Sequence, residues 1–196
     1  MLQLFGYISG FLAILCYVPY IRDILKGTTQ PERASWLIWT VLGFIAFFSQ
    51  LSEGASDSLW VTGIETFGVG IVFLLALKFG VGGLARRDIV ALVGAGVGLL
   101  LWYMTNDAST ALYIVIAIDA IGVVLTVMKA YKDPSSETFS TWFLAGLAGV
   151  FASFAVGKFD YVFLIYPFYL FLMNCAVCVA MLVGRARLRG LTKLEK

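Results

Sequence analysis

Long apolar runs separated by short polar segments make up almost the whole chain. A bilayer core about 30 Å thick needs roughly 20 apolar residues in a helix, and seven runs meet or approach that length. The runs are continuous rather than alternating, which favours helices over the strands of a membrane barrel. We therefore expect membrane-spanning helices at residues 3–25, 35–52, 57–79, 87–104, 109–132, 139–156 and 159–183.

The composition excludes an ordinary soluble domain, because 61% of the 196 residues are hydrophobic and only 13% are charged. No cationic leader precedes the first apolar run, so the first helix is expected to be retained rather than removed as a signal peptide. The net charge of +2 indicates no nucleic-acid partner. The expected fold class is an all-α integral membrane protein, with the lipid bilayer as its main partner.

The positions of the basic residues predict the orientation in the membrane. Lys and Arg are retained on the cytoplasmic side of membrane proteins. An external N-terminus places all but one of the 14 basic residues on that side, the exception being Lys158. We therefore expect the N-terminus outside and the C-terminus in the cytoplasm, in a plasma or inner membrane. The basic tail is then expected to lie near anionic lipid.

Two loops share one pattern. The segments Lys26–Trp36 and Lys132–Trp142 both run from a lysine to a tryptophan over the same spacing, through a turn rich in Ser, Thr and Pro. Each opens the next helix with a hydroxyl residue and a tryptophan, Ser35–Trp36 and Thr141–Trp142. A hydroxyl can cap free amide groups, and a tryptophan can anchor a helix end at the membrane interface. The pattern therefore has a local structural explanation beside that of an internal repeat.

The two loops also occupy equivalent places, because each joins the first two helices of a group of three. A second group of three would be inverted relative to the first unless one more helix carried the chain back across the membrane. We therefore expect seven transmembrane helices arranged as two parallel three-helix repeats joined by a linker helix, or 3+1+3. The expected boundaries are 1–83 for the first repeat, 84–106 for the linker helix, 107–184 for the second repeat and 185–196 for the basic cytoplasmic tail. Small residues in the linker, expected to allow close contact with a neighbouring helix, are Gly94, Gly96 and Gly98.

These features resemble the PQ-loop superfamily, which includes the SWEET and SemiSWEET sugar transporters, cystinosin-like transporters and the KDEL receptor. The resemblance spans nearly the whole chain and is carried by Pro19, the turn through Gly27, and Ser35–Trp36. The Pro-Gln dipeptide of the family reads Pro19–Tyr20 here, and Leu125 stands opposite Pro19 in the second copy. The resemblance implies alternating-access transport of a sugar or another small polar metabolite, or ligand binding without net transport as in the KDEL receptor.

Two acidic residues lie deep in the expected helices. Glu65 is about eight residues into its helix and Asp119 about ten, so both reach roughly 12 to 15 Å from the membrane surface. No Lys or Arg has a comparable central position. Charged groups at such a depth are costly, and they commonly serve in substrate or proton paths. The simpler alternative is a protonated carboxyl group that makes one hydrogen bond between helices.

Other residues could contribute to the same path. Asn174 can bind a polar ligand or join two helices by a hydrogen bond. Trp39 lies one turn inside its helix, where the ring can stack on a sugar or heterocycle or gate the cytoplasmic mouth. Pro19 and Pro167 interrupt apolar runs and serve as hinges or as static kinks. Threonines in the helices, Thr66 and Thr126 among them, are expected to bond back to carbonyl groups of their own helix.

Missing residue types argue against an enzyme. The chain contains no His, which removes serine–histidine proteolysis and histidine-ligated metal catalysis, and no Gly-rich phosphate loop is present. The last helix has no lysine in its interior for a Schiff base. We expect no cofactor and no metal site, and we expect the three cysteines Cys16, Cys175 and Cys178 to pack as small apolar residues.

The sequence therefore predicts a small-solute transporter working by alternating access, with or without proton coupling. The expected cavity is lined by Glu65, Asp119 and Asn174, with Trp39 nearby. The first alternative is a seven-helix receptor or interaction protein of the KDEL-receptor type, and the second is an assembly protein without a cavity. The chain is compatible with a homo-oligomer and does not require one.

Overall fold

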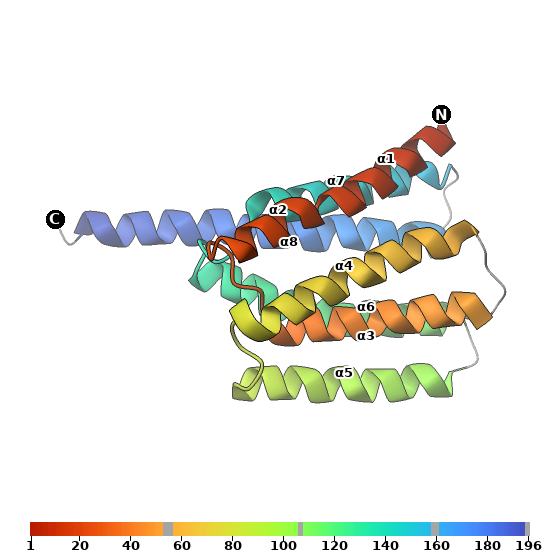
Figure 1. The fold of residues 1–196 in the computed structure, drawn as a ribbon, viewed down its shortest axis with the longest axis horizontal. Helices are drawn as coiled ribbons and strands as arrows, with labels where there is room; N and C mark the ends of the chain where they lie inside the picture. The colour runs from red at the N-terminus through yellow and green to blue at the C-terminus, as the bar shows by residue number, and fades with distance from the viewer. Residues whose placement is uncertain (53–56, 106–107, 158–160, 195–196) are drawn as a thin grey trace.

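The computed structural model describes residues 1–52, 57–105, 108–157 and 161–194. These residues form helices and no sheet, as Figure 1 shows. The first two helices, α1 and α2, follow each other directly and make one rod, so the described residues form seven rods. The helices are α1 (Leu2–Leu15), α2 (Tyr17–Leu25), α3 (Arg33–Ser52), α4 (Asp57–Phe79), α5 (Arg86–Met104), α6 (Ala108–Lys132), α7 (Phe139–Ala155) and α8 (Tyr161–Leu194).

Four segments are long and apolar enough to cross a bilayer, which indicates an integral membrane protein. They are Leu2–Leu25, Arg86–Met104, Thr110–Lys132 and Leu164–Leu191. Two shorter apolar helices, Arg33–Phe48 and Phe139–Ala155, accompany them. Large apolar side chains such as Phe11, Leu74 and Leu100 are exposed on the outside of the bundle, as lipid contact requires.

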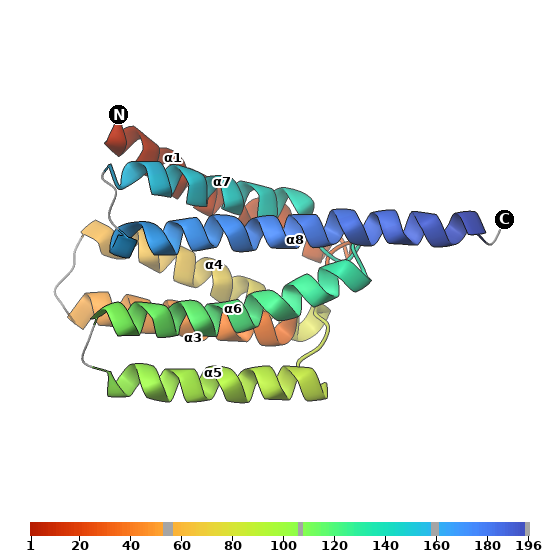
Figure 2. The same ribbon diagram turned by 180° about the vertical axis from the view of Figure 1, so that it is seen from behind.

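The helix limits agree with the expected ones to within a few residues, except at the C-terminus. The last helix was expected to end at residue 183, but α8 continues to Leu194 and projects beyond the rest of the bundle (Figure 2). The residues that follow Gly184 are mainly Ala, Leu and Arg, which favour helix. The first part of the basic tail is therefore a rigid extension of the last helix.

The two prolines have different effects on their helices. Helices α1 and α2 meet at Cys16, which keeps helical backbone angles and donates its N–H to the carbonyl of Leu12 at 3.0 Å. The missing N–H of Pro19 leaves the carbonyl of Leu15 without its helical partner. The Cys16 thiol donates to the carbonyl of Ala13 at 3.0 Å. Pro167, in contrast, lies inside helix α8, which continues on both sides of it.

The helices pack in matching pairs. Helix α3 lies along α4, and α7 lies along α8. Helix α1 packs on α7, while α6 packs on α3. The main irregularity is that α6 is in extensive contact with α8, whereas α1 and α2 touch α4 at few points. Accordingly, α1 and α4 diverge towards the end of the bundle that holds the N-terminus (Figure 1).

Helix α5 lies on the outside of the bundle and packs chiefly against α6. A Cβ atom on Gly98 would lie 2.6 Å from Ile118, and one on Gly94 would lie 3.5 Å from Ile121, so both glycines face α6. A Cβ atom on Gly96 would meet nothing within 4 Å. Close contact therefore depends on Gly98, whereas a side chain at Gly94 would meet α6 at an ordinary contact distance, and the expectation for Gly96 is wrong.

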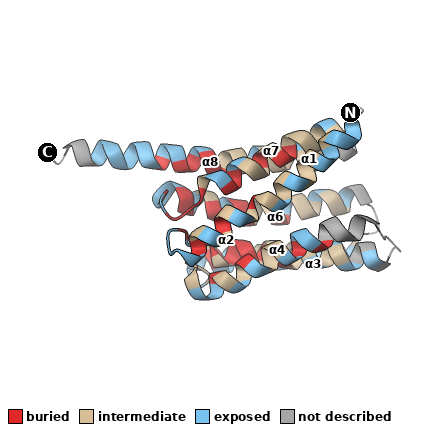
Figure 3. Ribbon diagram, turned by 45° about the horizontal axis from the view of Figure 1, so that its top comes forward, coloured by how far each residue is buried: buried red, intermediate tan, exposed pale blue. Residues whose placement is uncertain are grey.

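Burial is concentrated at one end of the bundle, which we call the loop end. It holds the connections 26–32, 80–85 and 133–138. The largest cluster of buried apolar residues lies beside these connections, and Figure 3 shows the buried residues gathered around α2 and the adjoining parts of α6 and α8. Helix α1, in contrast, contains no buried residue. The opposite end, which holds the N-terminus, is here called the far end.

Candidate functional site

A cavity of about 540 Å³ lies among α1, α3, α4, α6, α7 and α8. It begins near the middle of the bundle and extends towards the far end, since Ala46 late in α3 and Ala152 late in α7 both line it. The exposed residue Glu65 also lines it, so the cavity reaches the molecular surface beside α4. Its volume falls in the range of ordinary small-molecule sites.

Five of the six residues singled out in the sequence line this cavity. They are Trp39, Glu65, Asp119, Pro167 and Asn174. The sixth, Pro19, lies closer to the loop end and is not part of the wall. These residues come from four different helices, and the bundle packing brings them together. Their roles in binding or proton transfer remain predictions.

The two acids differ in their surroundings. Asp119 accepts a hydrogen bond from the hydroxyl of Tyr169 at 2.7 Å, which links α6 to α8. The simpler alternative expected for a buried acid, one hydrogen bond between helices, thus describes part of what Asp119 does. Glu65 has no hydrogen-bond or ion-pair partner within the described part of the chain, and its side chain faces the cavity.

A second cavity of about 170 Å³ continues the first towards the loop end. The two share Tyr17, Trp39, Asp119 and Asn174 in their walls. The Trp39 indole packs against Gly122, where a Cβ atom would lie 2.9 Å from its Nε1. Glycine is therefore required at position 122 if the ring is to keep this place between the two cavities.

Three aromatic rings lie at the loop end of the second cavity, where Trp36 and Trp142 line it and Tyr20 packs against both. Tyr20 and Trp36 have ring centroids 5.1 Å apart, and those of Trp36 and Trp142 are 6.4 Å apart. The Trp36 indole donates to the Tyr20 hydroxyl at 3.3 Å. Trp36 is 4% exposed and Trp142 is 7% exposed, so neither can anchor the protein in the membrane interface as the sequence suggested. They form an aromatic plug instead.

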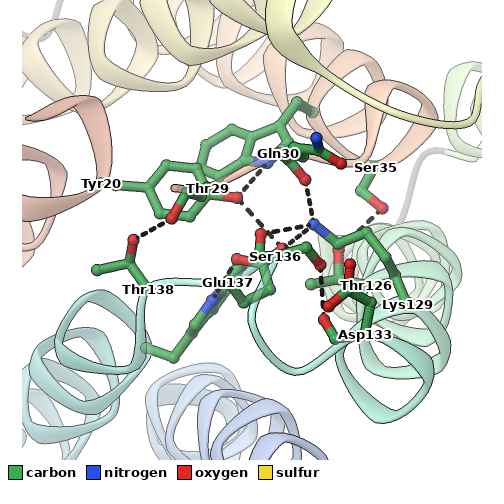
Figure 4. Close-up of polar contacts among 12 residues, drawn as sticks. Tyr20, Thr29, Gln30, Ser35, Thr126, Lys129, Asp133, Ser136, Glu137 and Thr138 are labelled. Carbon is green, nitrogen blue, oxygen red and sulfur yellow. Dashed lines mark hydrogen bonds and ion pairs between the residues drawn. The ribbon is translucent and has the colours of Figure 1, made fainter. Parts of the chain in front are cut away.

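A buried ion pair lies beyond the aromatic plug. Lys129 Nζ is 2.6 Å from a carboxylate oxygen of Glu137 (Figure 4). The same carboxylate accepts from the Trp142 indole at 2.9 Å and from the Tyr20 hydroxyl at 3.3 Å. The ammonium of Lys129 also donates to the carbonyls of Gln30 and Ser136. Both charges are thus paired and further hydrogen-bonded, as burial demands.

The two repeated loops are bonded to each other at this point. The amide of Gln30 donates to the carbonyl of Ser136 at 3.0 Å. The hydroxyls of Thr29 and Thr138 are 2.6 Å apart (Figure 4). Thr138 also donates to Asp23 at 3.0 Å. We call this set of contacts, together with Lys129–Glu137, the loop lock. Sequence reasoning missed it, because Lys129 and Glu137 both read as charges of a hydrated loop.

Hydroxyl groups in the helices also bond differently from expectation. Ser35 donates to the carbonyl of Gly122 at 2.7 Å and accepts from Thr126 at 3.0 Å, which joins α3 to α6. Thr66 donates to the carbonyl of Gly43 at 3.0 Å, which joins α4 to α3. The expected bonds of Thr66 and Thr126 back to their own helices are therefore wrong. Both threonines fasten neighbouring helices together.

The connection 80–85 holds the first loop in place. Val81 exchanges backbone hydrogen bonds with Pro31 and Arg33, both at 2.9 Å. Glu32 between them is fully buried, and its carboxylate lies against Gly82 without a hydrogen-bond partner in the described chain. Burial, and then the negative charge of Asp88, raise the pKa of Glu32 to about 7. This carboxyl group therefore titrates near neutral pH.

The three cysteines are free, and Cys16 and Cys178 are buried. Cys16 forms part of the wall of both cavities. No cluster of acids and cysteines suited to a metal ion lies within the described ranges.

No protein-family model, curated protein or solved structure matches this chain. The cavity, the aromatic plug and the loop lock are the features of this chain that bear on function.

Proposed function

We propose that the protein is a small-solute transporter that works by alternating access. The observation that carries this proposal is the one-sided closure of the cavity. The cavity reaches the surface beside α4, while towards the loop end it is closed first by the aromatic plug and then by the loop lock. A path blocked at one end and accessible at the other is what one state of such a transporter requires.

The packing supports two equivalent three-helix units, α1–α4 and α6–α8, with α5 as the linker between them. Helix α1 packs on α7 as α6 packs on α3, and α3 lies along α4 as α7 lies along α8. Equivalent positions of the two loops also meet. Gln30 and Ser136, each four residues after the loop lysine, are hydrogen-bonded, and Trp36 lies beside Trp142. Such contacts are those of an approximate two-fold axis along the membrane normal.

The irregularity in the packing indicates where the units move. Contact between α6 and α8 is extensive, while α1 and α2 touch α4 at few points. Closure of α1 onto α4 would seal the far end, and opening of the loop end would separate Lys129 from Glu137. The junction of α1 and α2, where Pro19 removes one backbone hydrogen bond, is a suitable hinge, because it lies between the part of the first rod at the cavity and the part at the loop end. Pro167 in the cavity wall is the second candidate hinge.

The basic residues favour the loop end as the cytoplasmic end. The N-terminus is then outside, the C-terminal extension of α8 is cytoplasmic, and the state described here faces outwards. We place the protein in a plasma or inner membrane. This topology, the 3+1+3 arrangement and the transport function all agree with the resemblance to the PQ-loop superfamily.

Uptake into proteoliposomes tests the proposal. The purified protein is reconstituted and assayed with a panel of small solutes, with and without a pH gradient. We expect protein-dependent uptake of at least one solute, and we expect the variant Glu65→Gln/Asp119→Asn to lose it. The matched control is Asp133→Asn, which removes an exposed carboxylate at the loop end, far from the cavity. Uptake by the double variant equal to that of the wild type would refute the role of the two acids.

A receptor of the KDEL-receptor type is the second candidate, because a cavity closed at one end is also what a ligand-binding protein without transport needs. The two differ in whether the loop lock ever opens. Crosslinking Thr29→Cys to Thr138→Cys in a variant without the native cysteines would hold the lock closed, since these side chains are in contact. Loss of uptake on crosslinking, restored by reduction, supports transport; ligand binding with no uptake in either condition supports a receptor.

A further inference from the structure

The balance of charge in the cavity limits what it can bind. Its wall carries two acids, Glu65 and Asp119, and no Lys or Arg among the described residues that line it. The nearest basic side chain of the loop lock, Lys129, is paired with Glu137 beyond the aromatic plug and is not part of either cavity wall. An anionic solute would meet repulsion from both acids with no compensating charge. The same absence disfavours a zwitterionic amino acid, whose carboxylate would remain unpaired.

The wall offers free acceptors on its two acids, beside the donor groups of Tyr17, Trp39 and Tyr166. Glu65 has no partner in the described chain, and Asp119 accepts one bond, from Tyr169, which leaves most of its lone pairs free. Asn174 donates one of its two amide N–H groups to the carbonyl of Leu170 at 2.7 Å, so its other N–H and its amide oxygen are left for a ligand. The hydroxyls of Ser9 and Thr66 are already engaged as donors to the backbone carbonyls of Ala148 and Gly43. A solute that donates hydrogen bonds suits this wall best.

Aromatic rings complete the wall. Tyr17, Trp39 and Tyr166 line the larger cavity together with the two acids. Rings of this kind attract cations through the negative charge on their faces. The volume of about 540 Å³, with a further 170 Å³ beyond Trp39, accommodates an organic molecule rather than a bare ion.

We propose that the solute is a small organic amine, bound in its protonated form with the ammonium group directed to Glu65 and Asp119 and its apolar part against the aromatic rings. This inference concerns the same cavity as the proposed transport function and rests on that proposal in treating the bound amine as a transported solute. Binding of the amine can be measured without transport. It separates the amine from neutral sugars, whose hydroxyl groups can donate hydrogen bonds to the same acids but do not balance their negative charge.

Binding to the full-length protein in detergent, measured by isothermal titration calorimetry, tests the inference with molecules that share one skeleton and differ in charge. The first set is tyramine, the neutral alcohol tyrosol, the anion 4-hydroxyphenylacetate and the zwitterion tyrosine. The second set is 4-aminobutanol, 1,4-butanediol and 4-hydroxybutyrate. We expect the amine to bind at least about tenfold more tightly than the other members of its set, as a charge-assisted hydrogen bond in a partly desolvated site predicts.

Variants locate the effect. Glu65→Gln is isosteric and is expected to weaken amine binding about tenfold or more while leaving the weak binding of the neutral alcohol unchanged. Asp133→Asn at the exposed loop serves as the matched control and is expected to bind like the wild type. Equal or tighter binding of an alcohol, acid or zwitterion, binding of no amine in either set, or amine binding insensitive to Glu65→Gln would each overturn the inference.

Failure of the amine inference and failure of the transport proposal give different results. Amine binding that depends on Glu65, with no uptake into proteoliposomes, would retain the amine site and refute transport. Uptake of a neutral sugar by the wild-type protein, with no preference for amines, would retain transport and refute the amine.

Discussion

The ammonium of Lys129 and the carboxylate of Glu137 lie 2.6 Å apart at the loop end, with both side chains buried. Lys129 lies in the last turn of α6 and Glu137 just before α7, and their ion pair joins these helices at the loop end. Its carboxylate also holds Trp142 and Tyr20, and its ammonium holds a carbonyl of the other loop. One ion pair thus links the polar lock to the aromatic plug beneath it.

Loss of one member of this pair should be strongly destabilising. Lys129→Met leaves a buried carboxylate without its counter-ion, and we expect a loss of about 3 to 5 kcal/mol of stability. The double variant Lys129→Met/Glu137→Gln should recover part of this loss, because no unpaired charge remains. Thermal unfolding in detergent measures both.

The control is Arg22, whose side chain is 61% exposed and whose removal leaves the bond from Thr138 to Asp23 in place. Arg22→Met should change stability by less than about 1 kcal/mol, since solvent screens its ion pair with Asp23. Equal effects of Lys129→Met and Arg22→Met would contradict the assignment of the loop lock.

Gly149 allows the closest approach of α7 to α8. A Cβ atom there would lie 2.8 Å from the backbone nitrogen of Phe171 and 2.9 Å from the carbonyl oxygen of Pro167. Because backbone atoms cannot rotate away, Gly149→Ala should separate the helices and cost about 1 to 3 kcal/mol. Gly96→Ala on α5 meets nothing within 4 Å and should be neutral or stabilising by less than about 1 kcal/mol. The two midpoints of thermal unfolding, compared with that of the wild type, decide the point.

Stability should depend on pH through Glu32. The pKa of this carboxyl group is raised from 4.5 to about 7 by burial and by the nearby charge of Asp88, against the opposing charges of Lys129 and Arg87. The folded state therefore binds the proton more tightly than the unfolded state. The stabilisation is fully present below pH 4.5 and is lost as the pH rises through about 7.

The loss amounts to at most about 3 kcal/mol. The loss is measured from the unfolding temperatures of the wild type and of Glu32→Gln between pH 4 and pH 8. The difference between the two proteins isolates Glu32, because the effects of the other titrating groups are common to both. The wild type should lose stability relative to Glu32→Gln as the pH rises. Parallel curves for the two proteins would show that Glu32 does not titrate in this range.

Accessibility to a water-soluble thiol reagent should separate the cavity from the loop end. In a background without Cys16, Cys175 and Cys178, a cysteine at Ala152 in the cavity wall should react about tenfold faster or more than one at Ala34, which is 1% exposed at the loop end. Faster labelling at Ala34 than at Ala152 without solute would contradict the direction of closure.

Much of the site was predictable from position alone. Glu65 and Asp119 were expected at similar depth because a helix rises 1.5 Å per residue, and both do line one cavity. The direction of their side chains was not predictable, since it depends on how each helix is rotated against its neighbours. Asp119 turned out to be bonded to Tyr169, whereas Glu65 faces the cavity without a partner in the described chain.

The repeated loops show the same division. Their tryptophans were expected to act as separate interfacial anchors, because each has a sufficient local explanation at a helix end. Only the packed structure brings Trp36 and Trp142 together and buries them, since contact between residues 106 positions apart depends on the assembly of all the helices.

The sequence by itself determined the helices, because about 20 apolar residues must form their backbone hydrogen bonds internally in lipid whatever their neighbours are. It also determined the polar connecting segments between the helices, including the two similar loops from Lys to Trp. The tertiary structure alone decided that Lys129 is buried in an ion pair with Glu137. It also decided that α6 packs closely on α8 while α1 diverges from α4, and that the cavity is closed at the loop end. Those features depend on side-chain direction and on contacts between distant segments, and neither is encoded in the spacing of apolar and polar residues.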